Sequence, residues 1–253
     1  MNRLRIRNAF SAVLILFALS LLGCAPAETG GSGRNGSRPA TPEEEWALRV
    51  IDPATVDELI LAWKEIPESL KGEFDAEFTP IDDSLERSTQ ADLAYWYTFA
   101  FFGSKFASAR QDHMEGRIGS SEANAIHTNV ARMMLGLPTL GVDEQLIELV
   151  HRLSNQMIAM CLVDMKWSKR YEGWSGLWNS SSATWIKMIE GAPPADKSQL
   201  AILRQDQAEY EQVMNQFFAY QNEIQTMRHV LSKKHNTQFP RVWDADLVTN
   251  QDR

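Results

Sequence analysis

The spacing of apolar residues in the last quarter of the chain is the feature that most limits the fold. Between residues 197 and 235, side chains of one row recur at intervals of three or four positions. The row consists of Leu200, Leu203, Gln207, Tyr210, Met214, Phe217, Gln221, Ile224, Arg228 and Leu231. This interval indicates one face of an α-helix about 58 Å long. Because helices of that length are stable mainly in bundles or coiled coils, we expect this segment to pack against others.

Three upstream segments carry helical periodicity as well, residues 84–116, 121–136 and 143–171. Apolar residues surround most of the first, which predicts the most buried helix. The third has a single seam with one acidic member: Leu146, Val150, Leu153, Met157, Met160, Asp164 and Trp167. No stretch shows the sustained period-two alternation typical of strands. We therefore expect an all-α fold, an elongated antiparallel bundle of about four long helices with a Trp-rich capping segment.

Short motifs predict where several helices begin. Thr41 precedes Pro42 and has Glu44 three positions later, which indicates a capping box with proline at the first helical position. The same reasoning assigns N-caps to four acidic residues and to one of two adjacent serines: Asp52, Asp83, Asp143 and Asp196, and Ser120 or Ser121. Pro67 is expected to end or kink the helix that Asp52 opens.

The amino terminus has the organisation of an export signal. Three arginines, Arg3, Arg5 and Arg7, precede an apolar run over residues 9–23 that is too short to span a bilayer comfortably. The run ends in Leu21-Leu22-Gly23-Cys24, which resembles the lipobox of bacterial lipoproteins. The resemblance implies cleavage before Cys24 and attachment there of a diacylglycerol and an amide-linked acyl chain such as palmitate. Several acyl chains together give stable membrane anchoring.

The residues that follow predict how the protein is held in the cell envelope. Residues 25–41 contain no large apolar side chain and are expected to form a flexible tether with a reach of roughly 20–25 Å. By the same resemblance, Ala25 after the cysteine implies the outer membrane, facing the periplasm. The predicted organisation is a signal peptide (1–23), a lipidated amino terminus and tether (24–41), a helical bundle domain (42–239) and an irregular tail (240–253) that Trp243 pins.

Charge and cysteine content exclude some classes of partner. Loss of residues 1–23 removes three arginines, which leaves 22 basic against 33 acidic residues and a net charge of −11. Such a chain is not expected to bind nucleic acid, and the lipid alone would hold it to the membrane. With Cys24 acylated, Cys161 has no disulfide partner, and its apolar neighbours predict a buried, unreactive thiol.

Tryptophans gather in the segment after the third long helix. Trp167, Trp174, Trp178 and Trp185 are interleaved with serines and with Asn179. Flat rings beside hydroxyl and amide groups suit a sugar, so Trp174, Trp178, Asn179 and Trp185 are candidate ligand-binding residues. The alternative, which we favour, is that the indoles fold inward as a cap over the end of the bundle.

Metal and haem sites have weaker sequence support. Glu148 and His151 are three positions apart on one helix, the spacing that di-iron bundles use twice, but it occurs once here. His127 and His151 are candidate haem ligands. Three methionines are candidate copper ligands, although such residues more often fill a core: Met157, Met160 and Met165. We expect no cofactor besides the covalent lipid, and no catalytic residue is identified.

The sequence thus predicts a non-enzymatic scaffold or binding module, with an envelope protein or glycan as partner. Gln207, Gln221 and Arg228 in the long row leave two options open. They specify register with a partner helix, including one from a second copy, or they lie at the edge of an intramolecular bundle, which is the option we favour. The alternative function is an envelope enzyme or ligand carrier with a site between the bundle and residues 174–185.

Overall fold

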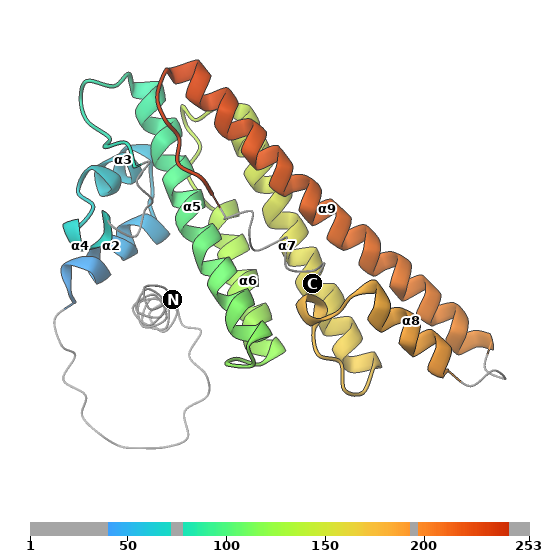
Figure 1. Ribbon diagram of the computed structural model, residues 1–253. Coiled ribbons are helices and arrows are strands. Elements are labelled where there is room, and N and C mark those ends of the chain that lie inside the picture. Colours follow the sequence, from blue (N-terminus) through green and yellow to red (C-terminus); the bar gives the residue numbers. More distant parts are fainter. Residues whose placement is uncertain (1–39, 72–77, 193–196, 243–253) are drawn as a thin grey trace, which may run out of the picture. The chain divides into compact units, whose positions relative to one another are not determined.

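The computed structural model describes residues 40–71, 78–192 and 197–242, and every regular element in these ranges is a helix (Figure 1). The elements are α2 (Pro42–Ile51), α3 (Val56–Lys64), α4 (Glu68–Lys71), α5 (Arg87–Met114), α6 (Ser120–Leu135), α7 (Glu144–Arg170), the 3₁₀ turn η1 (Leu177–Asn179), α8 (Ser182–Gly191) and α9 (Lys197–His235). The all-α prediction is confirmed, with α5, α6, α7 and α9 as its long helices. The lipobox, Asp196 and Trp243 lie outside the described residues.

The chain divides into two compact units. Of the described residues, unit 1 contains 40–71 and 78–101 together with Leu137–Asp143 and Val230–Arg241. Unit 2 contains the described residues of Phe102–Gly136 and Glu144–His229 together with Val242. The dividing points fall inside α5 and α9, so each of these two helices contributes a part to both units.

Unit 1 has an aromatic core in which buried indoles are hydrogen-bonded. Each of three rings is at most 1% exposed and donates its Nε1–H: Trp46 to the Ala62 carbonyl at 2.8 Å, Trp63 to the Thr98 hydroxyl at 2.7 Å, and Trp96 to the Pro240 carbonyl at 2.9 Å. Since an unpaired buried N–H is costly, these bonds fix how α2, α3 and residues 239–241 pack on the first half of α5.

Unit 2 is built on α6, α7 and α9. The side-chain contacts between α7 and α9 run in opposite directions along the two helices, which makes the pair antiparallel (Figure 1): Arg152 with Glu223, Gln156 with the Val213 carbonyl, Lys166 with Glu209, and Arg170 with Asp206. All seven residues of the predicted α7 seam are buried, Asp164 included. The predicted seam was therefore correct even at its acidic position.

The same α7 is long and apolar enough to cross a membrane by length and composition. It is the only such helix in the part of the chain that the structure describes. Core helices of soluble proteins meet the same criterion, and ten residues of α7 are buried inside unit 2. We therefore treat α7 as a core helix.

The helix starts agree with the sequence in some places and not in others. Thr41 forms the predicted capping box with Glu44. Asp52, expected to open the next helix, is instead the C-cap of α2, and Thr55 caps α3 through the Glu58 N–H. The predicted box at 83–86 is also wrong, because α5 begins only at Arg87. Gly119 is the N-cap of α6, without a side-chain bond, so neither predicted serine caps it.

Candidate functional site

Asp164 is the polar centre of unit 2. Its side chain is 4% exposed and accepts three hydrogen bonds: one oxygen from Asn124 Nδ2 at 2.8 Å, and the other from Trp174 Nε1 and the Leu177 N–H, both at 2.7 Å. These donors come from α6 and from the segment after α7. One carboxylate therefore holds residues 174–177 against the two helices, and its oxygens are already occupied by the protein's own donors.

Three of the four predicted tryptophans form one aromatic cluster. The rings of Trp167 and Trp185 lie 4.8 Å apart, and Trp174 is 5.3 Å from Trp167. Tyr171 and Tyr210 complete the cluster. Trp167 and Trp185 are completely buried, whereas Trp174 is half-buried.

Trp178 belongs to a second group of rings, with Phe106, Phe217 and His127 around it. It is 6% exposed. A sugar stacks on a ring face that solvent can reach, and neither Trp178 nor Trp185 offers such a face. Of the four candidate ligand-binding residues, only the half-buried Trp174 and the exposed Asn179 reach solvent.

The space enclosed by the second group is closed. Its lining includes His127, Met157, Cys161 and Asp164, and it has no room for a water molecule. Burial raises the pKa of the Cys161 thiol to about 11, so the thiol stays protonated and unreactive at neutral pH, as its sequence context predicts.

His127 is a buried imidazole that the fold keeps neutral. It is 1% exposed, its ring centroid is 4.2 Å from that of Phe106, and its Nε2–H donates to the Phe106 carbonyl at 3.3 Å. Burial, the main cause, lowers its pKa to about 3, with smaller contributions from the nearby His113 and Arg110. Because Nε2 is a donor here, it is not available as a metal or haem ligand.

We expect His127 to make stability dependent on pH. In the unfolded chain a histidine binds a proton near pH 6.5, whereas folded His127 does so only near pH 3. The stability that the neutral imidazole contributes is therefore complete above pH 6.5 and is lost as the pH falls. Between pH 7.5 and pH 5 the loss should be about 2 kcal/mol. Urea unfolding of His127→Gln should show a loss smaller by that amount.

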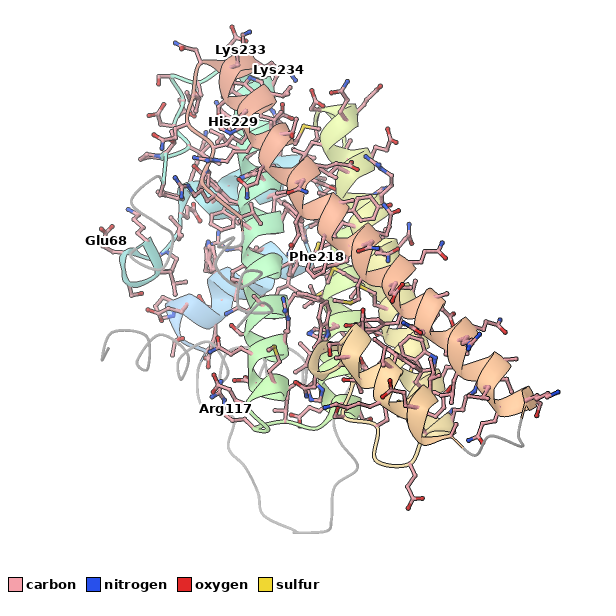
Figure 2. All side chains as sticks on the ribbon, turned by 45° about the vertical axis from the view of Figure 1, so that its right-hand side comes forward. Glu68, Arg117, Phe218, His229, Lys233 and Lys234 are labelled. Atoms are coloured by element: carbon pink, nitrogen blue, oxygen red, sulfur yellow. The ribbon has the colours of Figure 1, made fainter. Side chains whose placement is uncertain are left out.

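His229→Gln is the matched control, because this histidine is exposed on α9 (Figure 2). The loss of unfolding free energy between pH 7.5 and pH 5 should be the same in this variant as in the wild type. Equal losses in the wild type and in His127→Gln would contradict a buried neutral imidazole.

The residues predicted as metal ligands do not form a centre with other ligands. The Glu148 side chain is 71% exposed and lies 3.6 Å from Arg152. His151 is half-buried and its Nε2 has no hydrogen-bond partner. Met157 and Met160 are buried, whereas Met165 is 39% exposed. No group of three potential ligands occurs in the described ranges.

Sequence reasoning missed a buried polar network in unit 1. Asp92, 1% exposed, accepts from the Asp143 N–H and from His235 Nε2, both at 2.7 Å, and from Lys234 at 3.2 Å. Thr89 Oγ1 lies 2.8 Å from His235 Nδ1. This is the hydroxyl–imidazole–carboxylate order of a nucleophilic triad, but Thr89 is only 4% exposed, which closes it to a substrate. The network serves instead to hold 137–143 and the end of α9 on α5.

A second missed carboxylate is Asp206 on α9. It is 1% exposed and accepts from Tyr171 at 2.6 Å and from Arg170, with Lys166 at 3.5 Å. Burial raises the pKa of Asp206, but the hydrogen bonds from Tyr171 and Arg170 outweigh it and hold the pKa below its ordinary value. Asp206 lies three positions after Leu203 and four before Tyr210, so its spacing fits the buried face of α9. The predicted row placed Gln207 at this point of the face instead.

Comparison of the chain with protein-family models, with curated proteins and with solved structures finds no match.

Proposed function

We propose that this chain is an exported, lipid-anchored protein of the cell envelope that acts as a non-enzymatic scaffold or binding module. The observation that carries the proposal is the order of features at the amino terminus. A basic segment, a short apolar run, Leu21-Leu22-Gly23-Cys24 and a tether without large apolar residues follow one another before Thr41. The partner would be an envelope protein or a glycan, and the lipid would keep the helical body close to the membrane surface.

The hydrogen bonds of the buried aspartates are consistent with a non-enzymatic role. A general acid or base must exchange a proton with a substrate at hydrogen-bond distance. Three aspartates are buried in the described part of the chain, Asp92, Asp164 and Asp206, and each accepts at least two hydrogen bonds from the protein's own donors. They hold segments of the chain together, and the space that Asp164 lines has no room for a water molecule.

Cys24→Ala tests the anchor. Wild-type protein in a bacterial host should incorporate labelled palmitate and sediment with the membranes. Cys24→Ala should incorporate none and should leave the membranes once it is cleaved, because the thioether carries the lipid. Labelling and cell fractionation measure both results.

Cys161→Ala is the matched control, since it removes the other cysteine of the chain, a buried one. It should label like the wild type. Labelling of Cys24→Ala, or its retention in membranes as a cleaved form, would overturn the lipid anchor.

A further inference from the structure

Arg110 is a buried cation to which the structure gives no counter-ion. It lies near the end of α5, within unit 2, and is 7% exposed. Its Nε has no hydrogen-bond partner, and among the described residues no carboxylate acts on its charge. Burial lowers the pKa of the Arg110 guanidinium, but an arginine side chain still keeps its proton in proteins at neutral pH. A positive charge therefore stays inside unit 2 at every physiological pH.

The groups around Arg110 do not neutralise it. The guanidinium carbon lies 4.6 Å from the centroid of the Trp178 ring, which covers one face of the group. Tyr210 is near, but its hydroxyl donates to the Ser180 carbonyl at 2.6 Å and burial raises its pKa, so it carries no negative charge. His127 is neutral as well. The cation–π contact with Trp178 stabilises the buried charge in part, but it does not neutralise the charge as an anion would.

Two buried carboxylates of unit 2 differ from Arg110, because both have partners within the protein. Asp164 has three donors, and Asp206 has a cation and a hydroxyl at hydrogen-bond distance. Native proteins rarely leave a buried charged group without partners, since the desolvation penalty is then uncompensated. Arg110 is thus an exception that calls for an explanation outside the protein's own side chains.

The exposure of the individual nitrogens shows from which side a partner can come. Nε is unpaired and shielded from solvent. Neither Nη atom is among the unpaired atoms that solvent cannot reach, and no hydrogen bond joins either of them to a described residue. With Trp178 on one face, the Nη edge is the part that remains open. The two N–H groups of that edge match two oxygens of a carboxylate or a phosphate group.

We propose that Arg110 anchors a binding site for a small dissolved oxyanion, a carboxylate or a phosphate, held edge-on by the two Nη groups beside Trp178. Because Arg110 is 7% exposed and Trp178 covers one face of its guanidinium, a small solute is favoured over a lipid headgroup fixed in a bilayer. The inference does not depend on the lipid anchor, since every residue that carries it lies in unit 2.

Thermal unfolding of the full chain in a non-ionic detergent tests the site, whether or not Cys24 is lipidated. Sodium phosphate and sodium acetate are the probes, with sodium chloride at matched ionic strength as the reference. At least one probe should raise Tm in a saturable way beyond the effect of chloride. Arg110→Gln should weaken that response at least tenfold. Arg110→Lys, which keeps the charge but loses the paired donors, should give an intermediate response.

Arg117→Gln is the matched control, because this arginine is exposed near the end of α5 and pairs with Asp112 and Glu115 (Figure 2). It should respond like the wild type. No saturable response to either probe, or the same response in Arg110→Gln, would overturn the site, as would equal weakening in Arg117→Gln. If Arg110→Gln does not fold, the Tm responses of Arg110→Lys and Arg117→Gln to the two probes are compared instead. A response of Arg110→Lys as strong as that of Arg117→Gln would then overturn the site. Binding to phosphatidylglycerol vesicles without a response to free phosphate or acetate would overturn the dissolved ligand.

Discussion

Asp164→Ala is expected to lower the free energy of unfolding by about 3–5 kcal/mol. The substitution leaves three donors without an acceptor in the interior of unit 2: Asn124 Nδ2, Trp174 Nε1 and the Leu177 N–H. Each orphaned buried donor costs about 1–3 kcal/mol, and the removed carboxylate also leaves a void. Urea unfolding followed by circular dichroism measures the loss.

Asp164→Asn is the matched control for this prediction. The carbonyl oxygen of the new amide can still accept from Trp174 Nε1 and from the Leu177 N–H. Its NH₂ group then faces Asn124, whose own amide can turn to present its oxygen. Because all three contacts can be kept, the loss should be less than half of that for alanine. A loss under about 1 kcal/mol in Asp164→Ala would contradict the role of Asp164 in holding the Trp-rich segment.

Helix existence could be predicted from the sequence more reliably than helix starts. Helices expected at 143–171 and 197–235 are found at Glu144–Arg170 and Lys197–His235, because their apolar spacing extends over many turns. The start expected at 84 is three residues early. Asp82 accepts hydrogen bonds from both the N–H and the hydroxyl of Ser84, and this local turn competes with the first turn of a helix.

The candidate site could be predicted only in part. The sequence singled out Asp164 because it is the one acidic residue in the apolar seam of α7. Its hydrogen-bond donors could be identified only from the structure. Arg110 could not be recognised, because α5 has apolar residues on most sides and its sequence does not show which face a neighbour covers. The pairing of Asp92 with His235 joins positions 143 apart in the chain, and a single sequence contains no signal for such a contact.

Gly176 is the glycine at which an added Cβ is expected to be most destabilising. Its φ of 100° and ψ of 155° lie in a region that only glycine adopts readily. A Cβ there would also lie 2.4 Å from Nε2 of the buried His113, and 3.2 Å from the Ser120 hydroxyl. Strain and overlap act together, so Gly176→Ala should cost at least about 3 kcal/mol of unfolding free energy.

Gly173→Ala separates the two causes, because Gly173 also has a positive φ, of 73°, but its Cβ would meet no atom within 4 Å. It should cost about 1–2 kcal/mol from backbone strain alone. The additional loss of unfolding free energy in Gly176→Ala is then due to the contact with His113. In a double-mutant cycle, His113→Ala should abolish this additional loss, and only the loss from backbone strain should remain. Urea unfolding of the four chains measures the coupling. Equal losses at the two glycines, or no coupling to His113, would contradict the close approach of residues 176–179 to the end of α5, the approach that also brings Trp178 over Arg110.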